Sequence, residues 1–158
     1  MITIDEKIQI PASPATVWEI MSDPHQVVSC VPGASLGEAH EDGSFDGALT
    51  VQFGPMKIGF KARIQLTLDE PNRSGHLVAS GKDGQGGTRL QTDADFDVAP
   101  GADGAGSSLV TMGGNVEIKG RLASIVEGGA NVVVRRMTDQ FAERLTTKAR
   151  EAEAATRV

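Results

Sequence analysis

The sequence predicts an α+β domain in which a strongly curved antiparallel sheet is covered by one long C-terminal helix. Apolar and polar residues alternate in several segments before Arg121, which is the pattern of half-buried strands. Turn residues such as glycine, proline and asparagine separate these segments. From Arg121 onward the apolar residues recur at spacings of three and four, as on one face of a helix. A sheet with one apolar face must cover that face, and this helix can do so.

Length and composition indicate one domain and limit the function classes. The chain of 158 residues is expected to form a single domain at 1–150, followed by a short C-terminal tail at 151–158. One cysteine excludes an internal disulfide framework, and no segment reaches the roughly 18 apolar residues of a membrane span. The net charge of −6 disfavours nucleic acid as a partner. Because no signal-like segment opens the chain, we expect a cytoplasmic protein that reaches the inner face of the membrane only through a partner.

The first strand is predicted at residues 2–10, where four isoleucines alternate with polar residues. Glu6 breaks the alternation, because its phase places it on the same side as Ile4 and Ile8. An unpaired carboxylate on an apolar face costs several kcal/mol, so it must be paired, protonated or solvated. Two alternatives remain open. A local bulge turns Glu6 outward, or Glu6 is a polar point in an apolar pocket that bonds a ligand oxygen or a water.

Two short helices are predicted between this strand and the later strands. Ser13 and Pro14 supply an N-cap and a proline in the first turn, and Asp23 and Pro24 repeat that arrangement. Proline and glycine at 32–33 end the second helix.

Cys30 and His25 lie on the second of these helices and raise the question of a nucleophile with its base. Their separation of five residues aligns two side chains on a helix less well than three or four would. No third residue is evident that would orient the histidine. We therefore interpret Cys30 as a packed thiol in the wall of the interior. The three histidines, including His40 and His76, lie on separate segments without partners at ligand spacing, so no metal site is predicted.

The middle of the chain is predicted to be an antiparallel meander. Its alternating segments are 45–53, 56–68, 77–82, 90–98 and 110–118. Turns are expected at 71–75 and 83–87, and a loop at 100–107. The glycine-rich turn at 84–87 joins two strands and offers no lysine or helix start to an anion, so it is interpreted as a hairpin turn.

The final helix carries two glycines, Gly128 and Gly129, on its interior turns. Each costs up to about 1 kcal/mol relative to alanine, so something should offset that cost. Either the helix packs closely on the sheet at this point, or the missing side chains leave room for a ligand. The sequence favours the second alternative slightly.

Several short motifs, taken in order, resemble one protein family over nearly the whole chain. They are Glu6, residues 10–12 leading into Val17-Trp18, residues 23–24, 31–33 and 120–123, and Phe141 with Leu145. This order resembles the helix-grip proteins of the START-like superfamily and, within it, the CoxG family of carbon monoxide dehydrogenase subunits. The resemblance implies an α+β helix-grip fold, with about seven antiparallel strands, two short helices after the first strand and a long C-terminal helix on the concave face.

The resemblance also implies a function. Members are expected to be non-catalytic accessory proteins of a carbon monoxide dehydrogenase-type molybdenum enzyme, and to bind an apolar small molecule, with a quinone as the attractive candidate. No other cofactor, metal or catalytic residue is expected. Some members carry a C-terminal extension that reaches the membrane, which this sequence lacks, so no autonomous membrane anchor is expected.

The ligand is expected between the sheet and the long helix. Soft methionines beside aromatic rings suit a planar apolar guest, although the same residues would serve as plain core. The residues predicted to bind it are Glu6, Trp18, Val28, Phe53, Phe60, Phe96, Met112, Gly129, Met137 and Phe141. Two alternatives remain: an enzyme like the polyketide cyclases and hydrolases, with Glu6 as its acid or base, and an interaction module with a solid interior.

Overall fold

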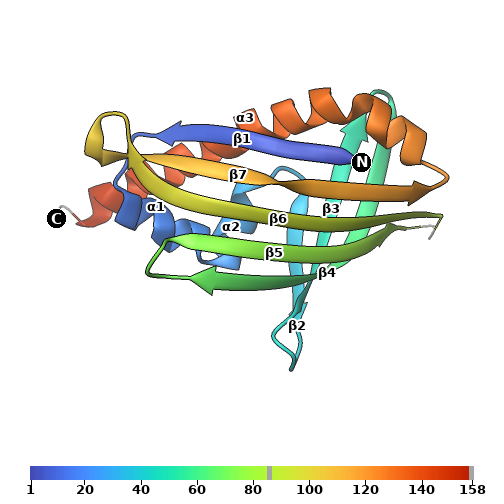
Figure 1. Ribbon diagram of the computed structural model, residues 1–158, viewed down its shortest axis with the longest axis horizontal. Coiled ribbons are helices and arrows are strands. Elements are labelled where there is room, and N and C mark those ends of the chain that lie inside the picture. The colour runs from blue at the N-terminus through green and yellow to red at the C-terminus, as the bar shows by residue number, and fades with distance from the viewer. Residues whose placement is uncertain (85–86, 157–158) are drawn as a thin grey trace.

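The computed structural model describes residues 1–84 and 87–156 and has one seven-stranded antiparallel sheet with three helices in that part of the chain. Strand order across the sheet is β1-β7-β6-β5-β4-β3-β2. The helices lie on one side of the sheet, behind it in Figure 1. The elements are β1 (Ile2–Ile10), α1 (Pro14–Met21), α2 (Pro24–Cys30), β2 (Ala34–Ala39), β3 (Phe45–Phe53), β4 (Met56–Asp69), β5 (Ser74–Asp83), β6 (Thr88–Gly101), β7 (Gly104–Gly120) and α3 (Ala123–Thr156). The predicted fold class is thus confirmed.

The two short helices begin where their capping residues predict. The Ser13 hydroxyl accepts a hydrogen bond from the Thr16 backbone N–H at 3.3 Å, which satisfies one free donor of α1. Asp23 does the same for α2, because its Oδ1 accepts from the His25 backbone N–H at 3.0 Å. The Gln26 amide donates to the other carboxylate oxygen of Asp23 at 3.2 Å. Both helices are therefore fixed at their starts by local sequence.

Several boundaries differ from those predicted. Strand β2 was not predicted, and it is a short edge strand that pairs with β3 alone through a register shift between Leu36 and Ala39. The expected loop at 100–107 is mostly strand, since β6 runs to Gly101 and β7 begins at Gly104. Helix α3 continues through residues 151–156, which were expected to be a tail. The centre of the turn predicted at 83–87, residues 85–86, lies outside the described residues.

The core consists of two separate clusters at opposite ends of the sheet's inner face. The first lies under α1 and α2 and includes Val17, Ile10 and Leu145, which are at most 1 % exposed. The second lies under the start of α3 and includes Phe60 and Val126. Helix α3 runs along both, packing mainly against β1, β3, β7 and the two short helices. Strands β4 to β6, in the middle of the sheet, have no comparable contact with it.

Candidate ligand-binding site on the inner face of the sheet

The middle of the inner face, between the two clusters, is paved with small side chains. Cross-strand pairing places Ala94 opposite Gly114 on one side and Leu77 on the other. In the next inward row, Ala79 lies between Thr92 and Ile64. We call this surface the central floor and define it by Ala62, Ala79, Thr92, Ala94 and Gly114. Small residues facing inward at the bend of a sheet leave space above them that larger side chains would fill.

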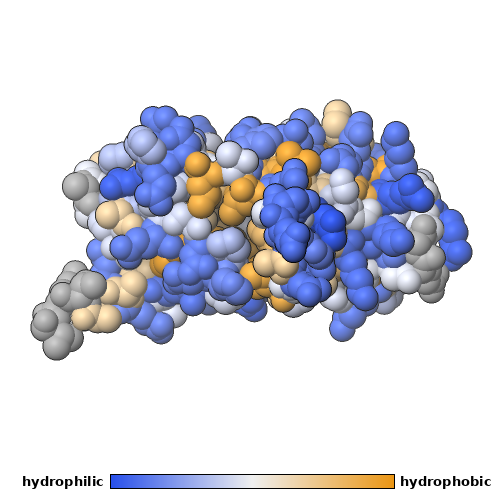
Figure 2. Space-filling view, turned by 90° about the horizontal axis from the view of Figure 1, so that it is seen from below, coloured by the Kyte–Doolittle hydropathy of each residue, from blue (hydrophilic) through white to orange (hydrophobic). Residues whose placement is uncertain are grey.

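The central floor is surrounded by apolar side chains that remain partly accessible. Ile4, Ile64, Leu66 and Leu77 point to the same inner side and are only half-buried, unlike the members of the two clusters. Helix α3 lies on this side of the sheet but does not seal these residues from solvent. In Figure 2, apolar side chains reach the surface in the middle of the face that is turned to the viewer, among hydrophilic ones. The inner face thus offers an accessible apolar surface at its centre.

The predicted ligand residues fall into two groups at either end of the central floor. Trp18, Phe96, Met112 and Phe141 belong to or pack against the first cluster. The rings of Trp18 and Phe96 have centroids 6.2 Å apart and are tilted by 36°, an arrangement favourable for aromatic pairs. Phe96 is half-buried and faces the floor.

The second group lies at the other end of the floor. Phe53 and Phe60 are buried in the second cluster, and Met137 of α3 packs against it. Val28 of α2 is half-buried and belongs to neither cluster. The structure therefore brings the predicted residues to two opposite walls, with the central floor between them.

Glu6 faces the inner side of the sheet. The pairing of β1 with β7 runs from Ile2 to Ile10 without a register shift, so the bulge considered from the sequence is not present. Glu6 lies opposite Met112 and is half-buried. Within residues 1–84 and 87–156, no hydrogen bond or ion pair is found for its carboxylate. It is a polar group with free bonding capacity where the central floor meets the first cluster.

Gly129 is a packing residue. A Cβ at this position would come within 3.2 Å of the Phe53 ring, so the missing side chain lets α3 approach β3 closely. This observation supports the close-packing alternative over room for a ligand. At Gly128 a Cβ would meet no atom within 4 Å.

The Gly128→Ala variant is expected to be more stable than the wild type by about 0.5–1 kcal/mol, because alanine favours the helix and enters open space. Urea unfolding monitored by circular dichroism measures this difference. Gly129→Ala is the matched control and should gain less, since its methyl group presses on Phe53. Equal gains in the two variants would contradict the close packing at Gly129.

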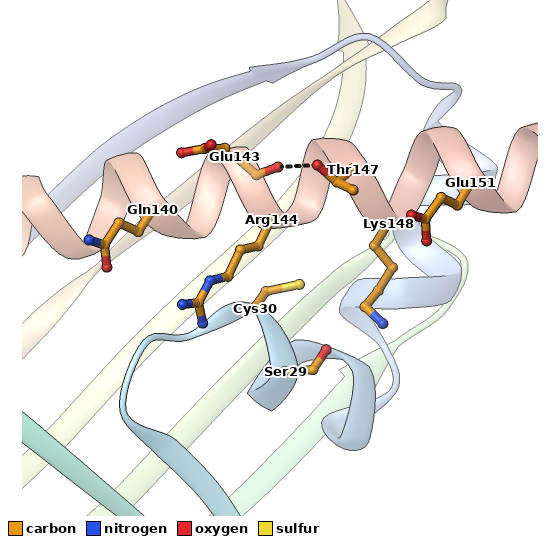
Figure 3. Close-up of a pocket in the computed structure, with 8 residues that line it drawn as sticks. All are labelled: Ser29, Cys30, Gln140, Glu143, Arg144, Thr147, Lys148 and Glu151. Atoms are coloured by element: carbon orange, nitrogen blue, oxygen red, sulfur yellow. Dashed lines mark hydrogen bonds between the residues drawn. The ribbon is translucent and has the colours of Figure 1, made fainter.

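A second, polar pocket lies between α2 and α3. It has a volume of about 560 Å³, and its lining residues are Ser29, Cys30, Gln140, Glu143, Arg144, Thr147, Lys148 and Glu151. Figure 3 shows Arg144 and Lys148 extending from α3 toward α2, with the Cys30 side chain between them. Cys30 is fully buried and belongs to the first cluster.

The Cys30 thiol is not an activated nucleophile. Burial raises the pKa of the Cys30 thiol above its ordinary value, and this cause outweighs the opposing effects of a Ser29 hydrogen bond and of Lys148 and Arg144. A thiol that stays protonated is a weak nucleophile. The interpretation of Cys30 as part of a wall therefore agrees with its surroundings.

Native protein at pH 8 is expected to react with Ellman's reagent at least about 100-fold more slowly than a model thiol, because Cys30 is buried and its pKa is raised. Unfolding in guanidinium should restore one reactive thiol per chain, which serves as the control. Fast native labelling would show that the groove between α2 and α3 opens to the thiol.

Sequence reasoning missed the central floor, although its residues were visible in the alternation. Ala62, Ala94 and Gly114 all lie on the inward phase of their strands. Their importance depends on the cross-strand register, which places small residues of neighbouring strands side by side.

Solved structures of similar fold come from several organisms. The conserved protein of Geobacillus kaustophilus is 20% identical, with 96% of this chain and 97% of that chain covered and a TM-score of 0.80. The ZhuI aromatase/cyclase of Streptomyces sp. R1128 is 14% identical, with 94% and 93% covered and a TM-score of 0.63. A START superfamily protein of Mycobacterium smegmatis is 17% identical, with 95% and 98% covered and a TM-score of 0.59. At these identities the likeness shows the START-like fold alone.

Sequence comparison is more specific. No curated protein gives a significant match. Within residues 1–84 and 87–156, none of the helices combines the length and hydrophobicity needed to span a bilayer. The family model for CoxG, a subunit of carbon monoxide dehydrogenase, matches residues 7–150, which include both core clusters, the central floor and nearly all of the sheet. The chain therefore belongs to the CoxG family of carbon monoxide dehydrogenase subunits.

Proposed function

We propose that this protein is a non-catalytic accessory protein of a carbon monoxide dehydrogenase-type molybdenum enzyme and binds an apolar small molecule on the central floor. The proposal rests on one observation above all, the accessible apolar surface between two separate core clusters. A ligand of planar shape would lie between the Phe96 and Phe53 ends of this surface, with Met112 and Met137 adjusting to its outline.

Burial of the ligand's apolar surface would supply the affinity, at roughly 25 cal/mol per Å² of area removed from water. Polar groups would orient the ligand. The Thr92 hydroxyl can donate a hydrogen bond to a carbonyl oxygen, whereas an ionised Glu6 carboxylate can only accept one. This pair of groups suits a quinone, because its oxidised form offers carbonyl acceptors and its reduced form offers hydroxyl donors. We therefore propose a quinone as the ligand.

The partner follows from the family. Membership of the CoxG family supports association with a carbon monoxide dehydrogenase-type enzyme, for which a bound quinone would serve as electron acceptor. In this role the protein supplies binding and orientation, and the partner enzyme carries out the redox step.

Trp18 provides a test of ligand binding. It is the sole tryptophan, it is 7 % exposed, and it packs against Phe96 at one wall of the proposed site. Titration with decylubiquinone should quench its fluorescence in a saturable way, with a dissociation constant in the micromolar range or below, about −8 kcal/mol. Free N-acetyltryptophanamide is the control for collisional quenching. Quenching that matches this control at every quinone concentration would contradict the proposal.

A second candidate function is an enzyme of the cyclase or hydrolase type, favoured by the unpartnered, half-buried Glu6 carboxylate. The variant Glu6→Gln separates the two candidates because it keeps the side-chain shape and removes the acid. Loss of turnover of a polyketide or ester substrate would support the enzyme. Quinone retention within about threefold of the wild type, with no turnover by either protein, supports the carrier.

A further inference from the structure

The outer face of the sheet, opposite the helices, carries four cationic side chains in a straight row. Lys61 pairs with Lys82, Lys82 with Arg89, and Arg89 with Lys119, so each cation lies directly opposite the next across β4, β5, β6 and β7. All four are exposed. With three strand spacings of about 4.8 Å, the row is about 14 Å long. It crosses the strands near the β5–β6 connection, at the right-hand end of the sheet in Figure 1.

This basic row is not neutralised by the protein itself. Like charges directly opposite one another destabilise a sheet, so the row opposes folding. Within residues 1–84 and 87–156, no ion pair or hydrogen bond is found for any of its four side chains. The four line a shallow groove of about 560 Å³, in which Glu117 is the one carboxylate. Arg121 adds a further cation nearby, since its side chain lies against Gly87 beside β6. In a chain of net charge −6, this concentration of unpaired cations indicates a surface that meets an anionic partner.

The rest of the outer face limits what that partner can be. Asp93, Asp95 and Asp97 follow on the same side of β6, beginning about 13 Å from Arg89 along the strand. His76 lies among them, with its Nδ1 2.6 Å from Asp95 and its Nε2 3.3 Å from Asp93. A nucleic acid or an anionic bilayer spread over this face would be repelled by the acidic end. No aromatic side chain lines the groove to stack on a base. A compact acidic patch can contact the basic end alone.

We propose that the basic row is a docking surface for an acidic surface of a protein partner. Carboxylates spaced about 5–6 Å apart, as at positions i and i+3 or i+4 of a helix, match the cross-strand spacing of the four cations. The central floor lies on the opposite face of the same strands, so docking here leaves the proposed ligand site uncovered. The choice of carbon monoxide dehydrogenase as the natural partner rests on the proposed function.

The test compares two charge-reversed variants of the full chain. K82E/R89E reverses the two central cations of the row. K7E/R135E is the matched control, because it makes the same change in net charge at an exposed lysine and an exposed arginine outside the row. Thermal unfolding and quinone retention are first measured for both, so that folding and the inner face are known to be intact. Binding is then measured by interferometry against purified carbon monoxide dehydrogenase holoenzyme, poly-L-glutamate, a single-stranded oligonucleotide and vesicles containing phosphatidylserine.

The row variant is expected to raise the dissociation constants for the holoenzyme and for poly-L-glutamate at least about tenfold at low salt, mainly through slower association. The control should change them less than about twofold, and added salt should reduce the difference. Equal weakening by both variants, or no binding of wild type to either acidic protein probe, would overturn the proposal. So would row-dependent binding to the oligonucleotide or vesicles alone. Row-dependent binding to poly-L-glutamate without binding to the holoenzyme supports the surface and removes the enzyme as partner, which counts against the proposed function instead.

Discussion

The Ala94→Phe variant is expected to lose quinone binding, with the dissociation constant raised at least about tenfold, because the added ring occupies the space above the central floor. Ala94 is half-buried and lies between Gly114 and Leu77, where the neighbouring side chains leave room for a larger group. The fold should survive, since that space is not filled by α3 in the wild type. Quenching of Trp18 fluorescence by decylubiquinone measures the loss.

Ala99→Phe is the matched control for this experiment. Ala99 lies further along β6, is half-buried, and has the phase that directs its side chain to the outer face. This variant should bind decylubiquinone within about twofold of the wild type, corresponding to less than about 0.5 kcal/mol. If Ala94→Phe binds as well as Ala99→Phe does, the ligand does not occupy the central floor.

The Leu145→Ala variant is expected to lose about 2–5 kcal/mol of stability, the usual cost of emptying a fully buried leucine site. Leu145 has no exposed surface and joins α3 to the first cluster, beside Phe141. A loss of this size is a large part of the total stability of a small domain. Urea unfolding of the two proteins, analysed with a common slope, measures it.

Val132→Ala on the same helix is the control for the Leu145 variant. Val132 is 70 % exposed, so its truncation removes little buried surface, and alanine favours the helix. Its stability should equal or slightly exceed that of the wild type. A loss at Leu145 no larger than at Val132 would mean that α3 does not hold the first cluster together.

The local pattern of the sequence was enough to predict most of the fold. The isoleucines of β1, the proline-containing starts of α1 and α2, and the apolar spacing along α3 each specify an element through its own residues. Strand β2 was missed because its six residues include Gly37 and its inward residues are few, so its place depends on pairing with β3.

The candidate site was less predictable, for a physical reason. The phase of Glu6 was correctly derived from β1 alone, but whether a bulge intervened depended on its pairing with β7. The central floor and the basic row each combine single residues of several strands, and only the register shows that they are neighbours. Gly129 illustrates the same limit, since the ring it packs against, that of Phe53, is far away in the sequence.

The most direct test of the central claim is native mass spectrometry of freshly purified protein, followed by organic extraction of whatever it retains. Our account predicts one apolar molecule per chain with the mass and absorbance of a quinone, and its absence from Ala94→Phe purified in parallel. A wild-type protein that carries no such molecule and takes up none after incubation with decylubiquinone would contradict a ligand site on the inner face of this sheet.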